Sequence, residues 1–199
     1  MKFFILALSL ASLSATAGAA NASSPAGVID HFHETLIAGM QGGNELGCKG
    51  RAEKLKPVID QTYDIPFLAE KVLRRDWGKL SAKQRKQFTH TLHDLVITTY
   101  AFEFSSFNDE TFETLKTQDM SQGRKLVRTR LQIPGDPAVS FDYLLQKRGG
   151  QWRVVNVITE GISDLAVRAQ QYSQALKERG FNGMISWLRE QIKKNQTDC

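Results

Sequence analysis

The chain has few of the residues and motifs on which most enzyme sites are built. Its 199 residues include two cysteines and four histidines, with no Cys-rich pattern and no His-Glu-x-x-His motif, so no zinc enzyme or zinc finger is indicated. No serine lies in a Gly-x-Ser-x-Gly elbow, and no glycine-rich phosphate loop is present. These absences remove the motif-based evidence for a serine hydrolase or a nucleotide-binding enzyme. Internal repeats and proline-rich linkers are also missing, so we expect one domain and no catalytic residues.

The histidines form two close pairs, neither of which completes a metal site by itself. His31 and His33 are two residues apart on a predicted helix and therefore point in different directions. His90 and His93 are three apart and could share a helix face, with Asp94 directly after them. A zinc site needs a third ligand, and no motif supplies one. We expect surface or partly buried histidines, with no metal and no cofactor bound.

Long apolar runs are missing as well, except at the N-terminus. Lys2 is followed by an apolar stretch over residues 3–13 and by small residues with Ala-x-Ala spacing over residues 15–22. This pattern predicts a secretory signal peptide over residues 1–22, too short to anchor the protein in a membrane. No cysteine lies near the predicted cleavage site, so no lipid anchor is expected. The mature domain is predicted to span residues 23–199 and to be exported.

The two cysteines, Cys48 and Cys199, would meet an oxidising compartment after export. An even number of cysteines in such a compartment favours a disulfide. The bond would tie the segment after the first helix to the extreme C-terminus. Pairing between two chains, or fraying of the terminal residue, remains open as an alternative.

Positive charge is concentrated between Lys71 and Lys86, in a chain whose formal net charge is +5. The only acid within that segment is Asp76. We interpret the segment either as a docking patch for anionic headgroups or an acidic protein, or as an ordinary solvated surface. No nucleic acid is expected as a partner, because the chain is predicted to be exported and contains no recognisable nucleic-acid-binding module. The positive residues are Lys71, Arg74, Arg75, Lys79, Lys83, Arg85 and Lys86.

The spacing of apolar residues changes once along the chain, from helical to alternating. Helical spacing predicts helices over residues 25–40, 51–61, 66–74 and from 82 to about 107, with a glycine-rich loop over residues 41–50. Alternation then predicts strands over residues 111–117, 124–133, 139–146 and from 152, joined by turns into an antiparallel meander. Two helices follow, separated at Gly180. The predicted class is α+β: N-terminal helices, a four-stranded antiparallel sheet and two C-terminal helices.

The last of these strands has apolar side chains on both faces. Strict alternation places Trp152, Val154 and Ile158 on one face, and Val155 and Val157 on the other. A strand that is apolar on both sides has an apolar neighbour against each face. Helices can cover one face, and the other face must then meet further helices or an apolar ligand.

Several short segments, in this order and spacing, carry a family resemblance over about residues 28–194. They are Tyr63-Asp64-Ile65 through Trp77-Gly78-Lys79-Leu80, Ser81-Ala82-Lys83-Gln84-Arg85 with Phe88, Leu95 to Tyr100, Val127-Arg128-Thr129-Arg130, Val139 to Leu145, Gly150-Gln151-Trp152 to Gly161-Ile162-Ser163, and Gly180-Phe181-Asn182-Gly183-Met184-Ile185. With these segments the chain resembles the MlaC family, also called toluene-tolerance or ABC-transporter auxiliary proteins, which are periplasmic phospholipid carriers of Gram-negative bacteria. The two cysteines are not part of the resemblance.

The resemblance implies a non-enzymatic periplasmic carrier that takes the acyl chains of a phospholipid into an apolar cavity between sheet and helices. Its implied partners are an outer-membrane lipoprotein–porin complex and an inner-membrane ABC transporter with an MCE-domain subunit, and its implied role is maintenance of outer-membrane lipid asymmetry. We expect a monomer. For the cavity we select apolar residues that have no obvious partner in their own element, although ordinary core packing would leave the same pattern. They are Phe67, Val72, Leu73, Leu92, Val96, Tyr100, Val127, Phe141, Tyr143, Val155, Val157, Ile162, Leu165 and Tyr172.

Three alternatives remain open from the sequence. The same scaffold could carry another apolar ligand, such as a hopanoid or a sterol-like molecule. The chain could be an enzyme on a fold like that of the nuclear transport factor 2 superfamily, which would need an acid–base pair, with Asp142 or Glu160 as candidates. Finally, it could be an adaptor that binds only protein, in which case its core would be filled.

Overall fold

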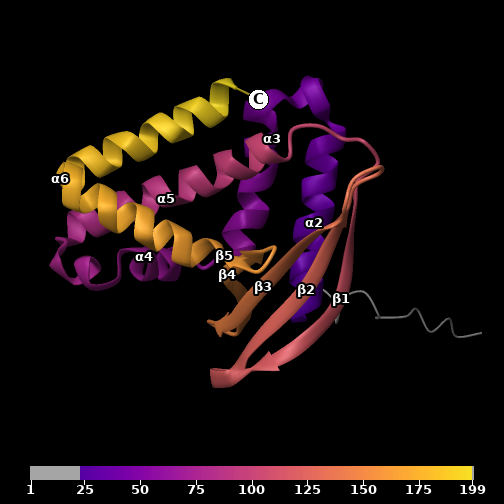
Figure 1. Ribbon diagram of the computed structural model, residues 1–199, viewed down its shortest axis with the longest axis horizontal. Helices are drawn as coiled ribbons and strands as arrows, with labels where there is room; N and C mark the ends of the chain where they lie inside the picture. The colour runs from indigo at the N-terminus through magenta and orange to yellow at the C-terminus, as the bar shows by residue number, and fades with distance from the viewer. Residues whose placement is uncertain (1–22, 199) are drawn as a thin grey trace, which may run out of the picture.

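The computed structural model describes residues 23–198 of the chain (Figure 1). The predicted signal peptide therefore lies outside the described residues, and so does Cys199. Cys48 lies on helix α3, and residues 23–198 contain no free cysteine. The pairing of Cys48 with Cys199 stays a prediction. Within residues 23–198 no helix has both the length and the apolar character that crossing a membrane requires.

The helices begin where the sequence places capping residues. Their bounds are α2 Pro25–Gln41, α3 Gly43–Thr62, α4 Ile65–Leu73, the 3-10 helix η1 Arg74–Lys79, α5 Ala82–Glu103 and α6 Asp164–Thr197. At the start of α5, the Ser81 hydroxyl accepts a hydrogen bond from the Gln84 amide at 3.3 Å. The Gln84 side chain in turn accepts one from the Ser81 amide at 2.9 Å. At the start of α4, the Asp64 carboxylate accepts a bond from the Phe67 amide at 3.0 Å. Both caps were predicted from the sequence.

Glycine conformation shapes the second and last helices. The predicted loop over residues 41–50 is wrong in extent, because α3 already begins at Gly43 and only kinks at Gly47, where φ is +56°. Gly180 has φ +64° and ψ 178°, which bends α6 sharply. Such a backbone conformation is readily adopted only by glycine. The two predicted C-terminal helices are therefore the two arms of α6, visible as the orange and yellow segments in Figure 1.

The strands form one antiparallel sheet in sequence order, as predicted. The strands are β1 Thr111–Met120, β2 Arg124–Gln132, β3 Val139–Arg148, β4 Gln151–Thr159 and the two-residue β5 Ile162–Ser163. The last of these adds a fifth strand to the four that were predicted, pairing Ile162 with Thr159. Gly149 and Gly150 both have positive φ, 55° and 82°, as a two-residue turn between β3 and β4 requires.

One prediction about β4 is wrong, because the strand contains a β-bulge. Across β3, Leu144 pairs with Asn156 while Leu145 pairs with Val154, so Val155 has no partner in the register. The extra residue reverses the alternation of side chains along the strand. Val154 and Val157 therefore share a face, whereas strict alternation placed them on opposite faces.

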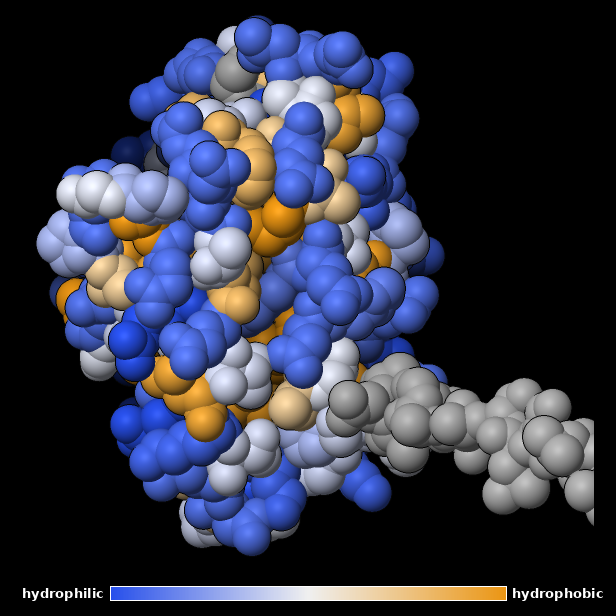
Figure 2. All heavy atoms as spheres, turned by 90° about the vertical axis from the view of Figure 1, so that its right-hand side faces the viewer, coloured by the Kyte–Doolittle hydropathy of each residue, from blue (hydrophilic) through white to orange (hydrophobic). Residues whose placement is uncertain are grey.

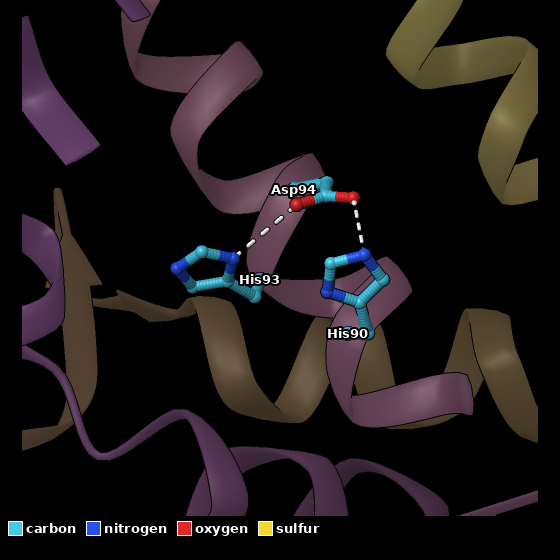
Figure 3. Close-up of side chains that lie close together, drawn as sticks. All are labelled: His90, His93 and Asp94. Atoms are coloured by element: carbon cyan, nitrogen blue, oxygen red, sulfur yellow. Dashed lines mark hydrogen bonds and ion pairs between the residues drawn. The ribbon is translucent and has the colours of Figure 1, made fainter. Parts of the chain in front are cut away.

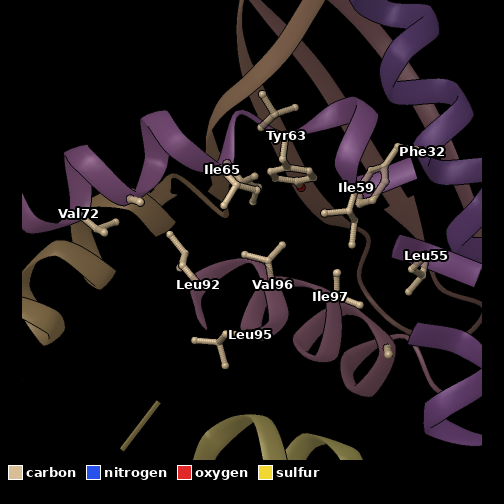
Figure 4. Packing of buried hydrophobic residues seen from close by; sticks show 14 of the residues in the cluster. Phe32, Leu55, Ile59, Tyr63, Ile65, Val72, Leu92, Leu95, Val96 and Ile97 are labelled. Carbon is tan, nitrogen blue, oxygen red and sulfur yellow. The ribbon is translucent and has the colours of Figure 1, made fainter. Parts of the chain in front are cut away.

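The sheet lies beside two groups of helices (Figure 1). Helix α2 packs against α3 and against β1 and β2, while α5 packs against α3, α4 and α6. In Figure 2, which shows the side facing right in Figure 1, hydrophilic side chains dominate and apolar ones show in the hollows between them. The core runs continuously between the two groups of helices. Figure 4 shows Leu92 and Val96 of α5 facing Tyr63 and Ile65 across this interior.

A buried histidine sits where α2 meets the sheet. His33 is 3% exposed, and its Nε2 lies 3.0 Å from the Tyr143 hydroxyl. Its ring stacks on Phe112, with 3.8 Å between the ring centroids. Burial lowers the pKa of His33 to about 3, so the imidazole is neutral at neutral pH and serves as a hydrogen-bonded part of the core.

Candidate functional site

A cavity of about 290 Å³ lies between the helices and the sheet. Its walls come from α4, α5, the strands β3 and β4, and the first turn of α6. Tyr63, just before α4, completes the wall. The α5 part of the wall extends to Thr99 and Glu103 in the last turns of that helix. The lining residues are Tyr63, Leu68, Val72, Leu92, Val96, Thr99, Tyr100, Glu103, Phe141, Val154, Asn156, Val157, Thr159, Asp164, Leu165 and Arg168.

Helical and strand periodicity explain how the apolar part of the wall forms. Leu68 and Val72 are four residues apart on α4, and Leu92 and Val96 are four apart on α5. Residues at this spacing lie on the same side of a helix. From the sheet, the bulge in β4 brings Val154 onto the cavity side with Val157. The wall therefore combines one stripe from each helix with the inner face of the sheet.

The end of the cavity near α2 is aromatic, and its hydroxyls bond to each other. The Tyr63 and Tyr100 hydroxyls are 2.5 Å apart. Phe32 packs edge-on against both rings, with centroid distances of 5.6 and 5.1 Å. Burial raises the pKa of both tyrosines well above the usual value, so both stay neutral. Because each hydroxyl has its partner within the wall, this end can accept an apolar ligand without leaving a buried polar group unpaired.

Another part of the cavity wall is charged. The Arg168 Nε donates to both oxygens of Asp164, at 2.8 and 2.7 Å, and its Nη1 donates to the Tyr172 hydroxyl at 3.2 Å. Burial alone would lower the pKa of Arg168, but Tyr172 and Asp164 outweigh it and raise that pKa. Loss of water around its carboxyl raises the pKa of Glu103, an effect that Arg168 partly offsets. The cavity wall thus combines apolar side chains with a charged group in which Asp164 and Arg168 form an ion pair.

The comparisons with known proteins agree with this architecture. The sequence matches the MlaC protein family over residues 31–190. The chain belongs to the MlaC family. The resemblance inferred from the sequence motifs is confirmed.

Two relatives of this MlaC family member are informative. The intermembrane phospholipid transport system binding protein MlaC of Haemophilus influenzae is 19% identical over 197 residues, covering 94% of this chain and 91% of that protein. A solved structure, the phospholipid-binding protein of Ralstonia solanacearum in complex with a phospholipid, is 20% identical. The two structures superpose with a TM-score of 0.70, over 84% of this chain and 96% of the Ralstonia solanacearum chain. At this level of identity the structural likeness establishes the fold, which is the α+β class predicted here.

The structure places one group of the predicted cavity residues in the cavity wall. The shared property of this group is that each lies on the inward stripe of its helix or on the inner face of the sheet. Their contact with lipid stays a prediction. These residues are Val72, Leu92, Val96, Tyr100, Phe141, Val157 and Leu165.

The other predicted cavity residues lie elsewhere, for three reasons. Leu73, Val127, Tyr143 and Tyr172 are at most 1% exposed and belong to the core. Val155 is the bulged residue of β4, and Ile162 is 63% exposed on β5. Phe67 is directed away from the cavity, with the Arg148 guanidinium 4.7 Å and the Lys71 Nζ 5.2 Å from its ring centroid. None of these residues lines the cavity.

Sequence reasoning missed the polar members of the wall because it selected only apolar residues. Thr99 and Glu103 continue the stripe of Leu92 and Val96 along α5, at seven and eleven residues from Leu92. Following the helical spacing from Leu92 and Val96 to the end of α5 would have found both of them. Leu68 had the same helical signal, four residues before Val72 on α4, whereas the other omissions had none. Those others are Tyr63, Val154, Asn156, Thr159, Asp164 and Arg168.

The basic segment predicted for docking occupies the end of α4, η1 and the start of α5, and part of its charge is engaged locally. Arg85 donates to the carbonyls of Trp77 and Gly78, at 3.0 and 3.1 Å. Lys79 pairs with Asp76 at 2.7 Å, and Lys71 pairs with Glu70 at 2.5 Å. The positions exposed to solvent without such a contact in the structure are Arg74, Arg75, Lys83 and Lys86.

Proposed function

We propose that this MlaC family member is a periplasmic phospholipid-binding protein that holds acyl chains in the cavity between α4, α5 and the sheet. The observation that carries the proposal is the cavity itself, whose wall is largely apolar and whose tyrosine hydroxyls are already paired. The family membership and the phospholipid named with the Ralstonia solanacearum relative support the same ligand. Residues 1–22 would direct export, and residues 23–199 would form the lipid-binding domain.

The energetics explain why a lipid carrier of this kind holds its cargo until it docks. Each methylene removed from water is worth about 0.8 kcal/mol, so every ten methylenes that the cavity takes up contribute ~8 kcal/mol. Spontaneous escape into water is correspondingly slow. Transfer therefore requires a partner that offers the chains another apolar site without exposing them. No covalent bond changes in such a carrier, so no catalytic residue is required.

The partners that fit this function are the outer-membrane lipoprotein–porin complex and the inner-membrane ABC transporter with its MCE-domain subunit. We propose that the protein shuttles phospholipid between them as a monomer and so helps to maintain outer-membrane lipid asymmetry. Its exposed basic positions, Arg74, Arg75, Lys83 and Lys86, would contribute the electrostatic part of docking.

The enzyme alternative is poorly supported by the placement of its candidate residues. Asp142 is on the face of β3 away from the cavity and lies 3.7 Å from the Arg128 Nε. Glu160 accepts a hydrogen bond from the Ser140 amide at the β4–β5 turn. Neither carboxylate lines the cavity, so the two do not form an acid–base pair there.

The direct test is to purify the exported protein without detergent, extract it with organic solvent and identify the extracted molecules by mass spectrometry. We expect phospholipid at close to one molecule per chain, because the energy of burial makes dissociation slow. Recovery of a hopanoid would select the alternative carrier function. A protein that is empty after purification, and that takes up no phospholipid from vesicles, would contradict the carrier proposal.

Charge reversal in the basic segment should separate docking from lipid retention. Replacing Arg75 and Lys83 with glutamate is expected to weaken binding to the reconstituted transporter while leaving the extracted phospholipid unchanged, because both side chains are exposed and neither lines the cavity. The matched control makes the same change to glutamate at Lys177 and Lys193, two exposed lysines of α6. Equal loss of binding in both variants would indicate a general charge effect rather than a docking site.

A further inference from the structure

The face of α5 that points away from the cavity carries three metal-ligating side chains close together. His90, His93 and Asp94 occupy positions i, i+3 and i+4 of the helix, and their ligand atoms all lie within 4.8 Å of one another. The Asp94 carboxylate reaches both histidines, with its Oδ1 3.3 Å from the His93 Nδ1 and its Oδ2 3.5 Å from the His90 Nε2. Figure 3 shows both rings directed toward this carboxylate.

A residue from a different helix fixes the orientation of one ring. Asp60, on α3, has its Oδ1 2.6 Å from the His93 Nε2, and its other oxygen is held by the Lys56 Nζ at 2.6 Å. A carboxylate can only accept, so the His93 Nε2 carries the proton that joins the two. A carboxylate that orients a histidine in this way is the usual companion of a metal-bound imidazole.

The distances also suit one metal in particular. Zinc bonds to histidine nitrogen and carboxylate oxygen at ~2.0–2.2 Å in tetrahedral geometry, which places neighbouring ligand atoms roughly 3.3–3.5 Å apart. The His93 Nδ1 lies 3.3 Å from one Asp94 oxygen and the His90 Nε2 lies 3.5 Å from the other, so each ring nitrogen is at a separation from the carboxylate that zinc ligands show. Imidazole nitrogen with carboxylate oxygen is a donor set suited to zinc, whereas magnesium and calcium prefer oxygen alone.

We propose that His90, His93 and Asp94 form a surface site for Zn²⁺, with Asp60 orienting His93. His90, His93 and Asp60 also line a surface depression together with Lys86, Arg148 and Arg153, from which water or a ligand atom of a partner would complete the coordination. This proposal departs from the expectation of no bound metal, which found no third ligand in a motif. The third ligand of the proposed site is Asp94, which directly follows His93 in the sequence. Asp60, which orients His93, comes near only because α3 packs on α5.

The test uses untagged protein treated with EDTA and then titrated with Zn²⁺ in competition with a chromogenic chelator. We expect one zinc ion per chain. Replacing His90 with alanine should weaken binding at least about tenfold, and replacing Asp60 with asparagine should weaken it roughly 10- to 100-fold. Magnesium at the same concentration should not displace the zinc.

The matched control is His31→Ala. His31 is an exposed histidine of α2 whose Nδ1 lies 3.8 Å from a Glu34 carboxylate oxygen, and so offers only two ligands. It should leave zinc affinity unchanged. His90 is 76% exposed, so its variant is expected to fold, and circular dichroism and the extracted lipid would verify this. Absence of stoichiometric zinc binding, or equal weakening by His31→Ala and His90→Ala, would overturn the proposal.

Discussion

Replacing Val96 with tryptophan is expected to lower the affinity of the protein for phospholipid roughly fiftyfold. Val96 lines the cavity from α5 and is 9% exposed, so the larger ring fills space that acyl chains would occupy. Tryptophan exceeds valine by the volume of about three methylene groups, and excluding three methylenes at ~0.8 kcal/mol each lowers affinity roughly fiftyfold. The measurement is phospholipid per chain after native purification, followed by uptake of a fluorescent phospholipid from vesicles.

The matched control for this variant is Val167→Trp. Val167 is on α6, is 40% exposed and does not line the cavity, so the same substitution there should leave lipid content unchanged. Thermal unfolding of both variants distinguishes a filled cavity from a destabilised fold. If Val96→Trp is folded and takes up the fluorescent phospholipid with the wild-type affinity, acyl chains do not occupy this part of the cavity.

Acid should destabilise the protein through a single buried histidine. Burial holds the pKa of His33 at about 3 in the folded state, whereas the unfolded chain has the ordinary value of about 6.5. The unfolded state therefore binds the proton more readily. Stability from the neutral ring is fully present above pH 6.5 and is lost as the pH falls toward 3. At pH 5 the loss is about 2 kcal/mol relative to pH 8.

The experiment compares denaturant unfolding of the wild type and His33→Phe at pH 8 and pH 5. The variant removes the titrating group, so its free energy of unfolding should fall by about 2 kcal/mol less than that of the wild type. It also loses the contact with the Tyr143 hydroxyl, which lowers stability at both pH values and cancels in the difference. His31→Phe, on the exposed side of the same helix, should behave like the wild type. An identical pH dependence in His33→Phe and the wild type would show that His33 is not responsible.

The local signals in the sequence predicted most of the fold, because they act over a few residues. The capping residues Asp64 and Ser81 mark helix starts, and the glycines at 149, 150 and 180 mark a turn and a bend. Alternation predicted the sheet, and the order of helical and alternating segments predicted the α+β class. The glycine-rich composition of residues 41–50 led to the prediction of a loop there. In the structure α3 begins at Gly43 and only kinks at Gly47.

The candidate site was predicted less completely than the fold. Periodicity selects a helix face but does not show what that face meets, so residues of the filled core such as Leu73 and Val127 were indistinguishable from those that line a cavity. The charged residues that reach the cavity from α6, Asp164 and Arg168, carry no apolar signal. Their position depends on how that helix crosses α4 and the sheet.

The sequence alone determined the family, the α+β order of elements, the helix caps and the apolar stripes of α4 and α5, since each of these depends on neighbouring residues or on a recognisable motif. Only the tertiary structure decided which side of β4 faces the cavity, because one unpaired residue, Val155, shifts the register against β3 and reverses the alternation. It likewise decided that Asp60 meets His93 from a position 33 residues earlier in the chain. Both features are set by how separate elements pack, and that information is not carried by any local pattern of residues.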